Sequence, residues 1–149
     1  MSTLVPRSVR RGVLALPLAV MLAAAAALPA VASADQVPLN VGQETTGSDT
    51  GASGKFTYRI TGDQLCYTLS ARNLSGPAMA AHVHVAPRNV AGPIVIPLTV
   101  GTGTSFTVSA CTTADEALLA LVDTNPRAYY VNVHTAAFPG GEIRGQLTH

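Results

Sequence analysis

The chain has 149 residues, with nine Lys and Arg residues against eight Asp and Glu residues. Three of the basic residues lie in an N-terminal segment that we interpret as a signal, so the remainder carries six basic and eight acidic residues and lacks a basic surface for nucleic-acid phosphates. The length suits a single domain, and the low charge, the absence of Trp and the many Gly and Pro residues are typical of a small extracellular β domain.

Residues 1–34 have the organisation of a secretory signal peptide. A basic region is followed by an apolar run rich in Ala and Leu and then by Ala32-Ser33-Ala34, the small-residue pattern that signal peptidase accepts. The Arg10-Arg11 pair is similar to a twin-arginine signal, but we interpret it as part of an ordinary basic region, where two arginines often fall together. We predict a secreted or cell-envelope protein that begins at Asp35. It has no membrane span after cleavage, because no later apolar run approaches the roughly 18 residues that a spanning helix needs.

Most of the remaining chain alternates between apolar and polar residues, which indicates half-buried strands. Asp35–Val41 is predicted to be a first edge strand, and residues 42–54, rich in Gly, Ser and Thr, a long turn or flexible loop. Pro97 predicts that the strand around it is an edge or contains a bulge. The later strands are predicted at Lys55–Ile60, Leu65–Leu74, Ala80–Ala86, Pro93–Val100, Phe106–Cys111, Ala128–Thr135 and Glu142–Thr148.

One helix is predicted among these strands. Thr113-Ala114-Asp115-Glu116 matches a capping box, with Thr113 as the cap, and the apolar Ala117–Val122 continues it until Asn125-Pro126. The carboxylates of Asp115 and Glu116 are therefore assigned to the start of the helix and not to an acid–base pair. Eight short strands with one helical insertion predict an all-β sandwich or barrel.

Cys66 and Cys111 are the only cysteines, and an exported chain meets an oxidising compartment. We predict that they form one disulfide. Closing a loop of about 45 residues would stabilise the fold by roughly 4 kcal/mol on the chain-entropy model. The alternative is a metal site on the two cysteines, although neither has another Cys or a His within four residues.

The histidines are the main candidates for a functional site. His82 and His84 are two residues apart in one predicted strand and share a face, and His134 lies on the polar face of another. If these strands adjoin the last one, the three histidines share an outer polar surface with Glu142 and Arg144. Such imidazoles suit Cu(II) or Zn(II), with Glu142 and Arg144 orienting the ligands. We favour the other interpretation, that they are structural histidines that hydrogen-bond to strand backbone or to Glu142, because no carboxylate- or Cys-rich cluster supplies a fourth ligand.

Several segments together resemble the CHRD domain, which is named for chordin and also occurs alone in secreted bacterial proteins. They are Ala81–His84, Ala91–Val95, Tyr130–Thr135 and Phe138–Leu147, and the resemblance covers about Lys55–Leu147. It implies an immunoglobulin-like or superoxide-dismutase-like β-sandwich and no established reaction. The His-Val-His run is also similar to the copper-binding strand of Cu/Zn superoxide dismutase, but the zinc-ligand loop of that enzyme has no counterpart.

We therefore predict a signal peptide at residues 1–34, a strand and flexible loop at 35–54 and a CHRD β-sandwich with one short helix at 55–149. The predicted function is that of a non-enzymatic binding or structural module with an unknown partner outside the cell or in its envelope, and no nucleic-acid partner. The alternative is a copper-binding protein or a copper-dependent oxidoreductase with a three-histidine site. An adhesion or matrix module is a third reading.

Overall fold

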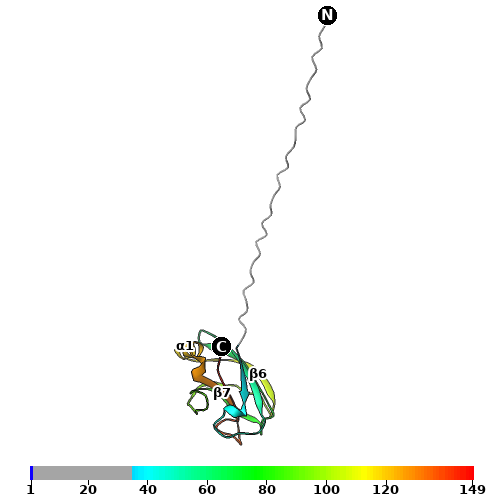
Figure 1. Ribbon diagram of the computed structural model, residues 1–149, viewed down its shortest axis with the longest axis vertical. Helices are drawn as coiled ribbons and strands as arrows, with labels where there is room; N and C mark the ends of the chain where they lie inside the picture. The colour runs from blue at the N-terminus through cyan, green and yellow to red at the C-terminus, as the bar shows by residue number, and fades with distance from the viewer. Residues whose placement is uncertain (2–34) are drawn as a thin grey trace. The chain divides into compact units, whose positions relative to one another are not determined.

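The computed structural model describes Met1 and residues 35–149 (Figure 1). The predicted signal peptide therefore lies outside the described residues, apart from Met1. Residues 35–149 form one helix, α1 (Glu116–Thr124), two 3-10 turns, η1 (Val41–Gln43) and η2 (Pro126–Ala128), and eight strands. The strands are β1 (Asp35–Asn40), β2 (Ser53–Thr61), β3 (Gln64–Arg72), β4 (Ala78–Val85), β5 (Ile94–Leu98), β6 (Phe106–Thr113), β7 (Tyr129–Thr135) and β8 (Ile143–Gln146).

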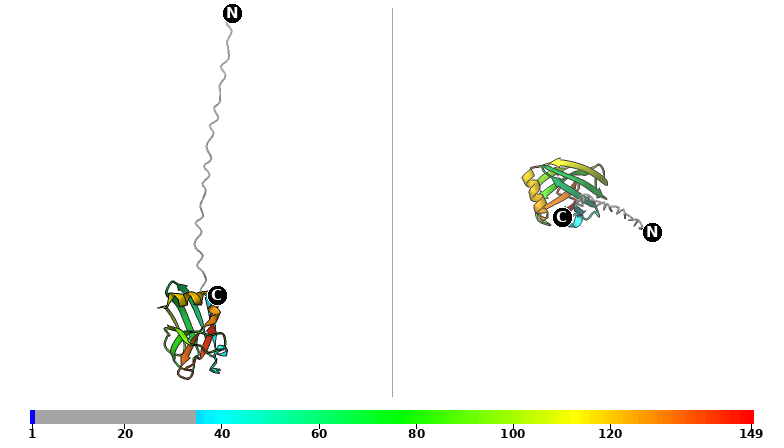
Figure 2. Two further views of the ribbon diagram at one scale, coloured as in Figure 1. Left: turned by 90° about the vertical axis from the view of Figure 1, so that its left-hand side faces the viewer. Right: turned by 90° about the horizontal axis from the view of Figure 1, so that it is seen from above.

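The eight strands form one antiparallel sheet in the order β5-β4-β7-β8-β1-β2-β3-β6. The sheet curls into a barrel-like form that is nearly closed, with β5 and β6 as its two edges (Figure 2). The prediction of an all-β fold with one helix is confirmed. The finer expectation of an immunoglobulin-like or superoxide-dismutase-like sandwich is not confirmed, because the hydrogen bonds run through one continuous sheet.

The core lies inside this curled sheet. The apolar residues that alternate along each strand face this interior. In β3 the buried residues are Leu65, Tyr67, Leu69 and Ala71, as the pattern predicts. Full burial of such side chains stabilises the fold by about 1.5–3 kcal/mol each. Other strands and α1 add to the same cluster Val37, Leu39, Phe56, Tyr58, Val83, Ile96, Leu119, Val122, Val131, Val133 and Ile143.

The two strands that the sequence marks as edges have different positions. The expectation for β1 is wrong, because β1 lies between β2 and β8, with Asn40 opposite Arg144. The expectation for β5 is confirmed: β5 is an edge strand, and the register of its pairing with β4 shifts between Val83 and His84. Pro97 lacks an N–H to donate, and a strand with only one neighbour tolerates it.

The helix is present, but its cap differs from the prediction. Asp115 is the N-cap, and its carboxylate accepts a hydrogen bond from the backbone N–H of Leu118 at 2.9 Å. Thr113 is the last residue of β6, because the strand continues two residues past Cys111. A capping pattern cannot show where a preceding strand ends. None of the helices in residues 35–149 is long and apolar enough to cross a membrane.

The predicted disulfide is confirmed, and the alternative of a cysteine metal site is wrong. Cys66 of β3 and Cys111 of β6 lie directly opposite each other and are bonded, with their Cα atoms 3.9 Å apart. The bridge lies on the outer face of the sheet and ties the edge strand β6 to β3. It therefore fastens a strand that has only one hydrogen-bonded neighbour.

The segment between β1 and β2 is a packed cover and not a free loop. Gln43, Ser48 and Ala52 are buried, and the hydroxyl groups of Thr46 and Thr50 donate hydrogen bonds to Gly141 and Glu142. Its polar composition reflects the polar face of β7 and β8 that it covers. We expected a flexible loop because composition alone cannot distinguish polar residues that face solvent from polar residues that face a buried polar surface.

Candidate metal-binding site

The three histidines project from two neighbouring strands. His82 and His84 alternate in β4 with Ala81 and Val83, whose side chains are buried in the core. His134 lies on β7, directly across from Ala80 and so diagonal to His82. Because side chains alternate between the faces of a sheet, all three imidazoles lie on the face opposite the core.

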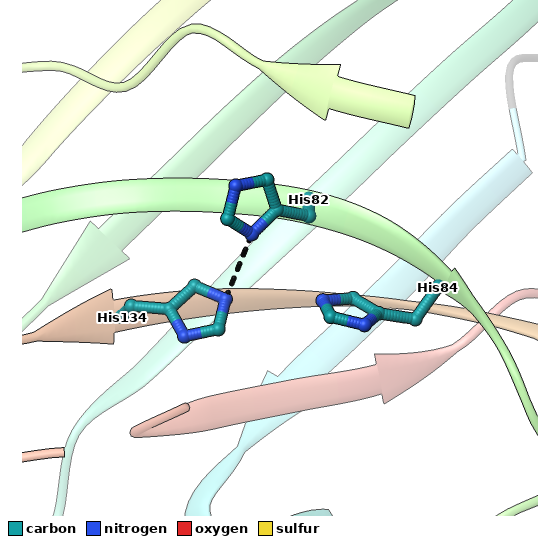
Figure 3. Close-up of side chains that lie close together, drawn as sticks. All are labelled: His82, His84 and His134. Carbon is teal, nitrogen blue, oxygen red and sulfur yellow. Dashed lines mark hydrogen bonds between the residues drawn. The ribbon is translucent and has the colours of Figure 1, made fainter. Parts of the chain in front are cut away.

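The imidazole rings converge on one point (Figure 3). The ring centroids of His82 and His134 are 4.8 Å apart, and those of His84 lie 5.6 Å from His82 and 5.9 Å from His134. One nitrogen of each ring lies within 4.8 Å of the other two. The structure thus brings together the three histidines that the sequence places on a shared polar face.

Backbone carbonyls fix the direction of two rings. His84 Nδ1 donates to the carbonyl of Gly92 at 2.8 Å, and His134 Nδ1 donates to that of Pro139 at 2.9 Å. A neutral imidazole carries one proton, so Nε2 of each ring is left with a lone pair. This is the arrangement in which proteins orient metal-binding histidines.

The inward nitrogens differ in their partners. His84 Nε2 is buried and makes no hydrogen bond. His134 Nε2 lies 3.0 Å from Nδ1 of His82, which must therefore be the donor. His82 is the most exposed of the three rings. If an ion binds at Nδ1 of His82, the ring can carry its proton at Nε2 instead, where water accepts the hydrogen bond. The cluster can thus present three lone pairs to one ion.

Burial favours the neutral form of the three histidines. Desolvation lowers the pKa of His82, of His84 and of His134 below the ordinary histidine value. The hydrogen bond from His84 to Gly92, the interaction of His84 with the Asn132 side chain and the hydrogen bond from His134 to Pro139 oppose this shift. The neighbouring imidazoles or the Arg144 charge add to it. Neutral imidazole is the form that binds metal ions.

Arg144 supports the site through an intermediate ring. Its guanidinium lies 3.3 Å from the centroid of Tyr130, and the other side of Tyr130 stacks on His84 with centroids 4.7 Å apart and an angle of 7°. The hydroxyl of Tyr130 accepts a hydrogen bond from the N–H of Gly92, the residue whose carbonyl holds His84. Arg144, Tyr130 and Gly92 therefore fix His84 as one unit.

Glu142 and Arg144 alternate with the core residue Ile143 and so lie on the face opposite the core, but loops cover this face and both side chains are completely buried. Arg144 donates to the carbonyls of Val90 and Pro87, each at 2.8 Å. These residues belong to the segment between β4 and β5, which covers the polar face from one side. Loops, and not solvent, therefore supply the hydrogen-bond partners of the polar residues on this face.

Glu142 accepts hydrogen bonds from other residues and not from the three histidines. Its carboxylate accepts hydrogen bonds at 2.7–2.8 Å from the hydroxyls of Thr50, Ser75 and Thr135 and from the backbone N–H of Ser75. These bonds outweigh burial and lower the pKa of Glu142, although desolvation is the largest single effect and acts in the opposite direction. Glu142 therefore anchors two loops to the end of β7.

Sequence reasoning missed a second carboxyl on the covered face, the half-buried Glu44. Glu44 lies beside Asn132 and Gly141, and burial raises its pKa while the Asn132 side chain and the Arg144 charge oppose this effect. Gly141 has φ of +127°, and a Cβ there would meet the Glu44 carboxylate, so only glycine suits this position. No periodicity surrounds Glu44, so the sequence offers no signal for it.

The cluster opens on one side to a small hollow of about 250 Å³. Two of the histidines, His82 and His134, form part of its wall, and the rest is almost wholly apolar. The other lining residues are Met79, Ala80, Ile94, Thr135 and Pro139. A ligand therefore has an apolar approach to the site.

Comparison with protein-family models matches residues 32–147 to the family described as the CHRD domain. The match covers the sheet, the disulfide and all three histidines. It agrees with the resemblance carried by the strand and turn segments around the site. The corresponding comparisons with curated proteins and with solved structures found no match.

Proposed function

The chain belongs to the CHRD domain family, and on this basis we propose that it acts outside the cytoplasm as a binding module whose histidine cluster holds a copper or zinc ion. The proposal concerns binding and includes no reaction. A partner in the extracellular space or the cell envelope would meet the protein with this ion in place.

Two features support the location outside the cytoplasm. The disulfide between Cys66 and Cys111 forms and persists in oxidising compartments. Residues 1–34 have the organisation of a signal peptide. We expect protein recovered from the medium or envelope of the producing cell to begin at Asp35, and N-terminal sequencing or intact mass measures this directly. Recovery of only uncleaved protein from the cytoplasm would contradict the location.

The observation that carries metal binding is the pair of inward Nε2 lone pairs on His84 and His134. Each is set by a hydrogen bond from the opposite ring nitrogen to a backbone carbonyl, and His84 Nε2 is buried without a partner. An unpartnered buried polar atom costs roughly 1–3 kcal/mol, which an ion would offset. Neutral imidazoles suit both Cu(II) and Zn(II).

The geometry requires a small adjustment on binding. Metal–nitrogen bonds of about 2 Å in a tetrahedral site bring ligand nitrogens to about 3.3 Å from one another. The facing nitrogens of His82 and His134 are 3.0 Å apart, and the full set lies within 4.8 Å. His82 is the least buried ring, so its rotation can complete the site while His84 and His134 stay fixed.

Metal analysis of protein without an affinity tag tests the proposal. After dialysis against Zn(II) or Cu(II), we expect about one ion per chain, and His82→Ala should lower the affinity by about 100-fold or more because one of three ligands is lost. The matched control is His149→Ala, which removes the fourth histidine, outside the cluster, and should leave binding unchanged.

The pH dependence provides a second readout. Binding competes with protonation of the imidazoles, and the lowered pKa values of the three histidines should let binding persist below pH 6.5, where ordinary histidines are mostly protonated. If Zn(II), Cu(II) and Cu(I) all fail to bind, the proposal is contradicted. It is also contradicted if His149→Ala weakens binding as much as His82→Ala does.

A further inference from the structure

A methionine stands at the mouth of the histidine cluster because the strand that carries it is irregular. Ala81 and Val83 of β4 face the core, so simple alternation would turn Met79 to the core as well. The register with β7 instead shifts between Ala78 and Ala80, which is the effect of a β-bulge. Bulges re-aim side chains beside functional sites.

The consequence of this bulge is that Met79 lies in the hollow beside the cluster. It lines the same hollow as His82 and His134, and 67% of its surface is exposed. It is the single methionine of residues 35–149. Its exposure shows that Met79 contributes little to the core, and the hollow places its side chain along the same wall as the imidazoles of His82 and His134.

The charges around the cluster favour an ion of low charge. The three candidate ligands are neutral, and the His84 ring stacks on Tyr130, whose far side carries the Arg144 guanidinium. Of the two carboxyls on this face, Glu142 is engaged by hydroxyl and amide donors of the loops, and burial raises the pKa of Glu44, which disfavours its charged form. A dication held by uncharged ligands near a guanidinium meets more repulsion than a monocation does.

We propose that Met79 supplies a thioether ligand that makes the three-histidine site selective for Cu(I). Thioether sulfur and imidazole nitrogen are ligands that Cu(I) accepts, whereas thioether is a poor ligand for Zn(II). The flexible methionine side chain can turn from the rim of the hollow toward the ion. Ile94 and Pro139 beside it form an apolar part of the same wall. This inference rests on the proposed metal-binding function.

Affinity measurements on two variants test the inference. Cu(I) affinity is measured anaerobically in ascorbate by competition with bathocuproine disulfonate, and Zn(II) affinity by competition with a chromophoric chelator. Met79→Leu preserves size and apolar character, and we expect it to weaken Cu(I) binding by about 10-fold or more with little change for Zn(II). Ile94→Ala is the matched control, because it alters the same hollow and keeps the thioether. It should change Cu(I) binding much less.

A spectroscopic readout reports the ligand itself. In protein labelled with [¹³C-methyl]methionine, the Met79 signal is the one that disappears in Met79→Leu. We expect this signal to shift when one equivalent of Cu(I) is added and to stay in place with Zn(II).

The outcomes separate the two proposals. If Zn(II) or Cu(II) binds through His82 but Met79→Leu leaves Cu(I) affinity unchanged, the thioether inference is overturned and the metal site remains. An equal loss of Cu(I) affinity in Ile94→Ala also overturns it. If neither Cu(I), Cu(II) nor Zn(II) binds to the wild-type protein, the proposed function itself fails.

Discussion

The outer faces of β6 and β7, two strands of one sheet, differ in how far they are exposed to solvent. All seven residues of β7 are buried, although Asn132 and His134 are polar. The eight residues of β6 alternate between half-buried and exposed, and its outward hydroxyl groups and Cys111 face solvent. Both strands turn apolar residues toward the inside of the barrel, where those of β7 are buried and those of β6 are half-buried. The larger difference arises from what lies outside them.

Loops account for this difference. The segments 41–52 and 86–93 cover β7 and β8, and they contribute partners such as Thr50 for Glu142 and the Val90 carbonyl for Arg144. Over β3 and β6 the outer face instead has direct cross-strand contacts, such as the 2.8 Å hydrogen bond between Thr68 and Ser109. A polar residue under a loop that loses its hydrogen-bond partner is left unsatisfied, whereas one that faces water can form a hydrogen bond to solvent instead. This contrast can be measured.

The largest effect is expected at the covered face. Glu142→Ala leaves four hydrogen-bond donors without their acceptor, and we expect the free energy of unfolding to fall by about 4 kcal/mol. Thr68→Ala on the open face also removes a hydrogen bond, but solvent replaces it, and the loss should stay below about 1 kcal/mol. Urea denaturation measures both. Equal losses would refute the distinction between the two faces.

The charge of Glu142 adds a pH dependence to that effect. Because its pKa is lowered in the folded protein, its contribution to stability is fully present above the ordinary carboxyl value and is lost as the pH falls through the lowered value. Glu142→Gln should remove this acid-sensitive part of the unfolding free energy. If the variant and the wild type lose stability in parallel from pH 6 to pH 3, Glu142 is not responsible.

The open face should depend on its covalent bond. Replacing Cys66 and Cys111 by Ala should reduce the free energy of unfolding by about 3 kcal/mol, because the bridge closes a sequence separation of 45 residues and fastens an edge strand. Metal binding at the histidine cluster should stay unchanged, since β3 and β6 form the opposite part of the sheet. Chemical denaturation together with metal titration separates the two effects, and a large loss of metal affinity would show that the halves are coupled.

The smallest effect is expected at the helix that follows β6. Asp115→Ala removes the side-chain cap and should cost about 1 kcal/mol. Thr113→Ala changes an exposed residue at the end of the strand and should cost less. Thermal unfolding of the two variants compares their stability directly. A greater loss of stability in Thr113→Ala would show that Thr113 caps the helix, as the sequence pattern predicts.

The predictable part of the fold is the part encoded locally. Alternation located the strands and the inward residues of β3, and Pro97 marked an edge. The place of β1 was not predictable, because pairing between Asn40 and Arg144 depends on residues at opposite ends of the chain. The single curled sheet is likewise a property of strand order and not of any strand alone.

The site divides in the same way. The alternation around His82, His84 and His134 placed each histidine on the polar face of its strand, and the pairing of β4 with β7, which the sequence could only assume, brings the three together. The same alternation assigned Glu142 and Arg144 to an outer face, but it could not show that loops cover that face. The roles of Gly92 and Pro139 were also hidden, because they act through backbone carbonyls, which every residue possesses.

The position of β1 has a consequence for how the chain folds. This first strand joins β8, the last one, to β2, so the sheet cannot be completed before the C-terminal end of the chain is available. The hairpin of β2 and β3 can form early, but a chain interrupted before Ile143 would leave β1 and β7 each with an unpaired edge. Pairing between such distant segments makes folding slow. The barrel can therefore close only after β8, at Ile143–Gln146, has been synthesised.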